Sequence, residues 1–161
     1  MIRPCAVEDV PAVAGVILAA DRQMDFTGRY RCGVNVPRIV RVLMNAIESP
    51  RADLSVVRLD GAVAGVCLVE LVPFLWDDRA LVAHEHLWHM HPEWPDARQK
   101  REWFIRMLDH MMAWVGSQGG ARFNIGAPPG SPAAKLLARR GLINHENYFT
   151  GDASWQPQLQ S

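Results

Sequence analysis

The densest group of chemically active side chains lies in residues 83–94, AHEHLWHMHPEW. Four of the chain's six histidines fall within this stretch, at His84, His86, His89 and His91. Imidazole binds metals and also exchanges protons near neutral pH, so these residue types allow a metal site or an acid–base site. They equally allow a strand whose histidines lie on the sheet with ordinary hydrogen-bond partners.

The spacing of the histidines argues against a shared metal. Side chains alternate between the two faces of a strand, so a regular strand would separate the first two histidines from Glu85 and the last two. A one-residue bulge between residues 86 and 89 would reset this alternation and bring all four to one face. Even then, neighbouring side chains would stand about 6.5–7 Å apart, and a tetrahedral metal would need His145 or a carboxylate from elsewhere. We expect no metal, and a histidine metal-binding protein is the weakest of three hypotheses.

Hydrophobic periodicity and turn signals predict the elements that must position these residues. Strands are expected at residues 1–5, 53–59, 62–72, 80–91, 121–127 and 142–151, and helices at 10–20, 36–47, 97–117 and 131–140. Asp9, Asn35 and Asp96 are expected helix N-caps, and Asp60-Gly61 favours a tight type I′ hairpin turn. Pro4 should keep the first strand at a sheet edge.

This order predicts an α/β fold, with helices on both faces of a mixed sheet. An antiparallel first half joins a parallel strand–helix–strand unit formed by residues 80–127. We expect one domain over residues 1–150, followed by a C-terminal tail at 151–161.

Composition limits the partners. The 161 residues carry zero formal net charge, so we expect neither nucleic acid nor a membrane surface as partner. The apolar run at residues 10–20 is too short to span a bilayer. Cys5, Cys32 and Cys67 form no CxxC pair, which favours reduced thiols and a cytoplasmic location.

Two segments resemble motifs of the GCN5-related N-acetyltransferase (GNAT) superfamily, especially its small bacterial and phage-type members. EHLWHMHPEW (85–94) resembles E-x-L-W-x-V-x-P-E-Y on that family's fourth strand. SPAAKLLARRGLI (131–143) resembles N-x-x-A-x-x-x-Y-x-x-x-G-F, with Ala134 and Gly141 matching. The resemblance covers residues 2–150 and implies an acetyl-CoA-dependent N-acetyltransferase, in which an amine attacks the thioester directly.

The resemblance also implies where acetyl-coenzyme A (acetyl-CoA) lies. The pantetheine arm would follow the strand at 80–91, where a bulge around Leu87–Met90 would offer backbone groups, and the diphosphate would meet the start of the 97–117 helix. The implied binding residues are Trp88, His89, Met90, Arg98, Gln99, Lys100, Arg101 and Ser131. The family's phosphate loop, Arg/Gln-x-x-Gly-x-Gly/Ala, has no glycine in the matching PDARQKREW (95–103), so its basic side chains would have to substitute.

Acetyl transfer needs a base for the amine and a proton for the departing thiolate. Glu85 occupies the strand position where the resemblance implies the base, and the alternatives are Glu70, the other carboxylate in reach, and one of His89 and His91. Tyr148 is the expected proton donor, because Leu137 stands where the family has its tyrosine. Residues expected around an acceptor are Phe26, Tyr30, Glu70 and Trp76. Each of these also has an ordinary structural interpretation as a strand or loop-anchoring residue.

The acceptor would be a small-molecule or peptide amine, and exposed tryptophans would also suit a homodimer interface. The missing glycines and Leu137 favour a second hypothesis from another class. In that hypothesis, a GNAT-like domain of phage type has lost catalysis and serves in binding or assembly.

Overall fold

The computed structural model describes residues 1–24, 34–74, 77–119, 122–128 and 130–143. The chain divides into two compact units, Met1–Ile125 and Gly126–Ser161. The first unit holds a five-stranded sheet with its helices, and the second holds one described helix, α5 (Pro132–Arg139).

The strands of the first unit lie in the order of the chain. They are β1 (Ile2–Pro4), β2 (Ala52–Leu59), β3 (Ala62–Phe74), β4 (Asp77–Met90) and β5 (Arg122–Asn124). β1 to β4 pair antiparallel, and β5 pairs parallel to β4. The predicted fold class, a mixed sheet with an antiparallel first half joined to a parallel strand–helix–strand unit, is therefore confirmed. β1 lies at the edge, as Pro4 predicted.

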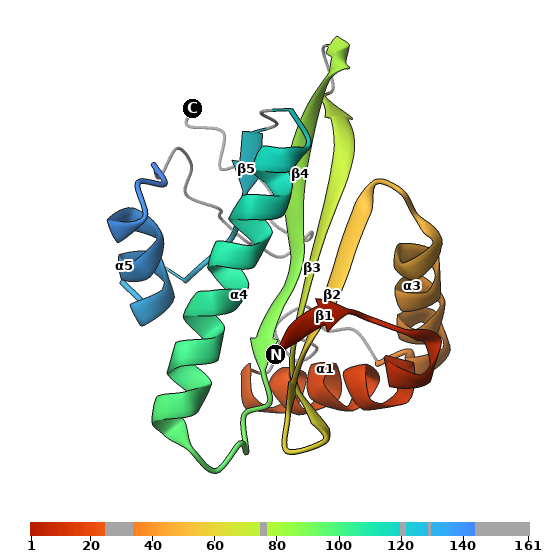
Figure 1. The fold of residues 1–161 in the computed structure, drawn as a ribbon, viewed down its shortest axis with the longest axis vertical. Helices are drawn as coiled ribbons and strands as arrows, with labels where there is room; N and C mark the ends of the chain where they lie inside the picture. The colour runs from red at the N-terminus through yellow and green to blue at the C-terminus, as the bar shows by residue number, and fades with distance from the viewer. Residues whose placement is uncertain (25–33, 75–76, 120–121, 129, 144–161) are drawn as a thin grey trace, which may run out of the picture. The chain divides into compact units, whose positions relative to one another are not determined.

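Helices cover both faces of this sheet (Figure 1). A 3₁₀ turn, η1 (Val7–Asp9), leads into α1 (Val10–Met24), which packs with α3 (Val36–Glu48) on one face. Their apolar stripes share a core with Leu54, Val56, Val66 and Leu68 of the sheet. The other face is covered by α4 (Ala97–Ser117), through Met107, Leu108, Met111 and Val115. No helix in the described part of the chain is long and apolar enough to cross a membrane.

Local signals set most boundaries. Asp60 and Gly61 have φ of 49° and 81°, as the predicted type I′ turn requires; glycine adopts such angles freely, and aspartate tolerates them better than most residues. Asn35 accepts from the Arg38 N–H at 2.9 Å, and Asp96 from the Gln99 N–H at 2.9 Å, so both predicted caps are confirmed.

The predicted N-cap at Asp9 is wrong. Asp9 ends the 3₁₀ turn, and its carboxylate reaches back to accept the Ala6 N–H at 3.0 Å. Because the 3₁₀ turn runs directly into α1, the helical run begins at Val7 with Ala6 as its N-cap, and Asp9 lies in the interior, where it meets two arginines.

β3 and β4 are longer than predicted, because the strands continue to Phe74 and resume at Asp77. The predicted strand at 121–127 shortens to β5. Leu142 and Ile143 are not in a strand, and the remainder of the predicted last strand and the tail lie outside the described residues.

Candidate functional site

A one-residue bulge interrupts β4 at its centre. Val69 of β3 pairs with Glu85, while the preceding Leu68 pairs with Leu87, so His86 is the extra residue. The bulge considered from the sequence is therefore present, at the start of the 86–89 window. Its effect is to shift the alternation of side chains by one position for the rest of the strand.

The bulge lies just beyond the point where β4 and β5 stop pairing. In the described residues their parallel ladder joins only Val82–His84 to Arg122–Asn124. β5 ends there, whereas β4 continues to Met90 along β3. β4 thus changes its backbone geometry where its second neighbour ends.

The bulged residue is paired with a carboxylate. His86 Nε2 lies 3.0 Å from Glu70 Oε2, and both side chains are 46% exposed. Glu70 is opposite His84 in the ladder, so His84, Glu70 and His86 share the face that α1 and α3 cover farther along the sheet. A solvent-accessible imidazole held at one nitrogen by a carboxylate is an arrangement suited to proton transfer.

The bulge also brings His89 to this face, because Val66, its ladder partner, lies in the α1 and α3 core. Burial lowers the pKa of His89, which favours the neutral imidazole. His91 follows β4, accepts the Glu93 N–H at Nδ1 (3.3 Å), and lines a groove of about 520 Å³ against α1.

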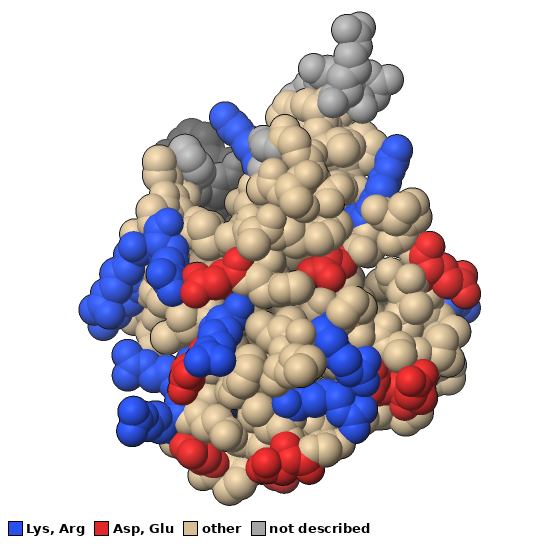
Figure 2. All heavy atoms as spheres, viewed as in Figure 1, with Lys and Arg blue, Asp and Glu red and all other residues tan. Residues whose placement is uncertain are grey.

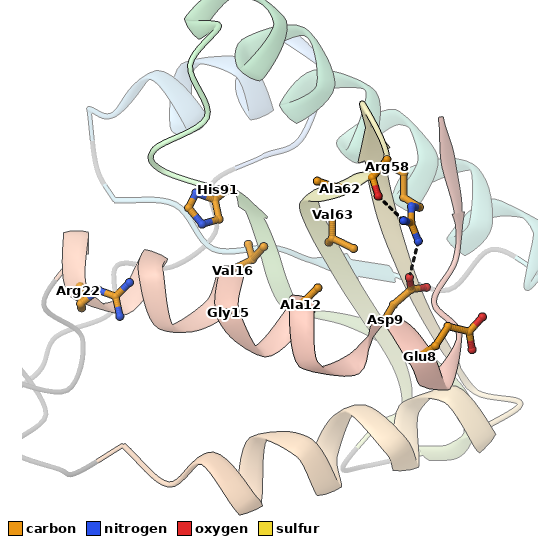
Figure 3. Close-up of a pocket in the computed structure, with 11 residues that line it drawn as sticks. Glu8, Asp9, Ala12, Gly15, Val16, Arg22, Arg58, Ala62, Val63 and His91 are labelled. Carbon is orange, nitrogen blue, oxygen red and sulfur yellow. Dashed lines mark hydrogen bonds and ion pairs between the residues drawn. The ribbon is translucent and has the colours of Figure 1, made fainter.

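Figure 3 shows that His91 and Arg22 lie toward one end of this groove and Glu8, Asp9 and Arg58 toward the other. Asp9 and Arg58 are bound to each other at 3.0 Å. The charged end is therefore held together by a structural ion pair.

Glu85 lies on the opposite face of β4. Val69, which pairs with Glu85, lies two positions from Cys67 on β3, so both residues face the side of the sheet that α4 covers. Burial first, then the charge of Asp53, raises the pKa of the Cys67 thiol, and Glu85 adds a smaller contribution. Glu85 and His89, two of the alternative bases expected from the sequence, therefore project from opposite faces of β4.

Trp88 and Met90 share that face and are buried. Trp88 stacks on Phe104 of α4, with ring centroids 3.9 Å apart, and donates from Nε1 to the Phe104 carbonyl oxygen at 3.0 Å. Their side chains belong to the core, which leaves their backbone as the part that can meet a ligand.

His110 of α4 joins the same face through Asp53 Oδ2 at 2.8 Å and Ser55 Oγ at 3.1 Å. Ser55 is fully buried, so this Asp–His–Ser group fastens α4 to β2 and offers no exposed nucleophile.

Two side chains in the first turn of α4 are hydrogen-bonded to the loop that precedes the helix. Gln99 accepts from Trp94 Nε1 at 2.7 Å, and Lys100 Nζ donates to the Pro92 carbonyl oxygen at 2.9 Å. Arg98 and Arg101 are exposed. Figure 2 shows basic and acidic side chains side by side on this face of the molecule.

Ser131 caps α5 by accepting the Ala134 N–H at 3.1 Å, within the second unit. Leu137 of the same helix is buried. Phe26, Tyr30, Trp76 and Tyr148 lie outside the described residues. Within the described ranges, no three His, Cys, Asp or Glu side chains gather closely enough to hold a metal ion.

Sequence reasoning missed the pairing of His86 with Glu70. Strict alternation grouped His86 with His84 but gave no sign of the bulge, and Glu70 is 16 residues away in the chain. A bulge depends on how two strands fit along their whole length, and no local residue pattern marked this one.

Comparison with solved structures confirms the GNAT-like fold. A predicted acetyltransferase of Clostridium acetobutylicum, solved with acetyl-CoA, is 9% identical and has a TM-score of 0.68, with 94% of this chain and 95% of that chain covered. An aminoglycoside 6′-N-acetyltransferase of Acinetobacter haemolyticus is 9% identical with a TM-score of 0.65, covering 97% and 99%. A transcriptional regulator of Bacillus halodurans is 16% identical with a TM-score of 0.69, covering 94% and 99%.

No family model matches the sequence, and no curated protein matches it. At such low identities the structural likeness establishes the fold alone.

Proposed function

We propose that the protein is an N-acetyltransferase that uses acetyl-CoA and acts on a small-molecule amine. The observation that carries the proposal is the coincidence, on β4, of the bulge at His86 with the end of the β4–β5 ladder at His84. The acetyltransferases that share the fold, one of them solved with acetyl-CoA, support it.

The donor is proposed to lie along β4 after the bulge, beside Leu87–Met90, on the side where β5 has ended. A pantetheine arm contains two amides, and an extended chain with amides can add to a strand edge as another strand would. Bound there, the donor supplies the thioester carbonyl that the amine attacks. Backbone N–H groups of β4 then donate to the carbonyl oxygen as it gains negative charge.

His86 is proposed as the general base, with Glu70 as its positioning residue. The exposed imidazole takes a proton from the attacking amine, and the Glu70 carboxylate fixes the orientation of the ring. Glu85, the base expected from the sequence, lies on the α4 face. His89 is less accessible than His86, and Tyr148 stays the proposed donor to the leaving thiolate.

The acceptor class is proposed from chemistry and from likeness. Glu70 adds negative charge beside His86, which suits a cationic amine before it loses its proton. Two of the similar structures are aminoglycoside acetyltransferases, one from a soil metagenomic sample and solved with sisomicin. A polyamine or amino sugar is therefore the first class to assay.

A catalytically inactive binding domain is the second candidate. It is favoured by buried Leu137, which cannot supply a proton, and by the glycine-free start of α4.

Binding separates the two candidates. Acetyl-CoA at 100 times its dissociation constant should stabilise the protein by about 2.7 kcal/mol, visible as a raised melting temperature. No shift at millimolar acetyl-CoA refutes the enzyme proposal. Binding without turnover across a panel of polyamines, amino sugars and peptide amines favours the inactive domain.

Substitution tests the base. We expect His86→Ala to lower kcat by about 100-fold or more, with partial recovery on adding imidazole. Glu70→Gln should lower kcat less, and Glu102→Gln is the matched control, because Glu102 is also in an exposed carboxylate pair, with Arg106. Glu85→Gln belongs in the series: a larger loss there than in His86→Ala returns the role of base to Glu85.

A further inference from the structure

The first turn of α4 is already provided with a negative charge. The Asp96 carboxylate accepts the Gln99 N–H at 2.9 Å, and its main-chain carbonyl accepts the Lys100 N–H at 2.8 Å. A helix N-terminus favours negative charge, and here the chain's own carboxylate already supplies one.

Two side chains that were expected to hold a diphosphate are held elsewhere. Gln99 is bound to Trp94 and Lys100 to the Pro92 carbonyl, both across the loop that leads into the helix. Residues 93–101 carry three basic side chains (Arg98, Lys100, Arg101) and two acidic ones (Glu93, Asp96), while Glu102 is ion-paired with Arg106. The segment therefore has a net positive charge of only one with which to attract phosphate, and Lys100 is already bound to the Pro92 carbonyl.

A second anion at this helix start would meet the Asp96 carboxylate at close range. Like charges at such close range repel each other, and near a protein surface water screens only part of that repulsion. The side chains at the start of α4 thus do not fit the phosphates of coenzyme A.

Resting on the proposed function, we infer that the donor is recognised through its pantetheine thioester and that the nucleotide end contributes little. The substrate class is then acyl-pantetheine thioesters in general, including those that carry no nucleotide. The transferred group and the bond that breaks are unchanged: the acyl carbon leaves sulfur for nitrogen, and the amine proton passes to the base.

The test compares acetyl-CoA with S-acetylpantetheine on the full chain, by calorimetric dissociation constants and by kcat/KM. We expect the two thioesters to differ by less than about threefold in each. Two or three charge-assisted hydrogen bonds to phosphate would instead give a preference of about 100-fold or more for acetyl-CoA. That preference overturns the inference and leaves the proposed function intact. Binding of neither thioester overturns the proposed function itself.

Asp96→Asn isolates the carboxylate, because asparagine caps a helix as well as aspartate does. It should tighten acetyl-CoA binding by about tenfold, through loss of repulsion, and leave S-acetylpantetheine unchanged. Glu93→Gln is the matched control: it removes the same charge from an exposed, non-capping position and should change neither constant by more than about twofold. An unchanged acetyl-CoA affinity in Asp96→Asn contradicts the argument.

Discussion

Asp9 gives the sharpest prediction about stability. This carboxylate is 2% exposed and accepts from three groups: the Ala6 N–H at 3.0 Å, Arg3 at 2.8 and 2.9 Å, and Arg58 at 3.0 Å. These contacts join β1, the start of α1 and the end of β2. We expect Asp9→Asn to keep one acceptor oxygen but turn an NH₂ group toward donors.

The cost follows from those contacts. An Ala6 N–H left without an acceptor costs about 1–2 kcal/mol. The arginine side chains are 31% and 38% exposed, so water replaces part of each lost contact, and we assign each arginine about 0.5–1 kcal/mol. Asp9→Asn should therefore lower the free energy of unfolding by about 2–4 kcal/mol, which lowers the melting temperature by roughly 5–15 °C.

The pH dependence has a defined sign. Burial alone would raise the pKa of Asp9, but the Ala6 N–H and the two arginines outweigh it and hold that pKa below its usual value. The unfolded chain thus binds this proton first, and the stabilisation is complete above about pH 4 and lost as the pH falls through the folded-state pKa.

Urea unfolding followed by circular dichroism, from pH 7 down to pH 2, measures this contribution. The gap between wild type and Asp9→Asn should narrow in acid. Glu8→Gln is the control, an exposed neighbour whose loss should change the free energy of unfolding by less than about 0.5 kcal/mol. A gap at pH 7 under about 0.5 kcal/mol, or one that stays constant down to pH 2, refutes the reasoning.

Three further predictions concern buried groups. Gly65→Ala should destabilise the protein by about 1–3 kcal/mol in the same unfolding assay, since its Cβ would lie 2.5 Å from Met90 Sδ and 3.1 Å from the His89 carbonyl oxygen. A Cβ added at Gly15 would have no atom within 4 Å, so Gly15→Ala should stabilise α1 by about 0.5–1 kcal/mol. If the two substitutions changed the free energy of unfolding equally, the packing argument for Gly65 would be contradicted. Burial, and after it the charge of Asp9, raises the pKa of the Cys5 thiol to about 11, and burial also raises the pKa of the Cys67 thiol. Neither thiol should therefore be alkylated at pH 8 until the protein is unfolded, which peptide mass spectrometry measures. The pKa of the His89 imidazole, measured by NMR, should lie below the usual value of about 6.5. Because the unfolded chain takes up that proton more readily than the folded one, wild type should lose stability relative to His89→Gln as the pH falls from 7 to 5. A titration midpoint above about 6.5 would be inconsistent with the burial of His89.

Much of the fold could be predicted because its signals are local. Asp60-Gly61 specifies a turn by its own backbone preferences, and Asn35 and Asp96 cap the helices that follow them. The buried stripe of α4 repeats at helical spacing, so its existence and length followed from the sequence.

What failed depends on partners distant in the chain. Asp9 looked like a helix cap because the residues after it are apolar, but its role is set by Arg58, 49 residues away. The bulge at His86 arises from the register with β3, which fixes the faces of all later residues in β4. The bulge, which has no local signature, therefore decides that Glu85 and His89 lie on opposite faces of the strand.

The short β4–β5 ladder also has a consequence for how the sheet opens. In the part of the chain that the structure describes, β5 is held to β4 by three residue pairs, whereas β3 and β4 are paired along most of their length. Local opening needs least free energy where few backbone hydrogen bonds must break together, so amide protons of β5 should exchange with solvent far sooner than those of β3. A thioester arm lying beside β4 would slow exchange on that strand, so deuterium uptake can report occupancy of the strand edge without any chemical turnover.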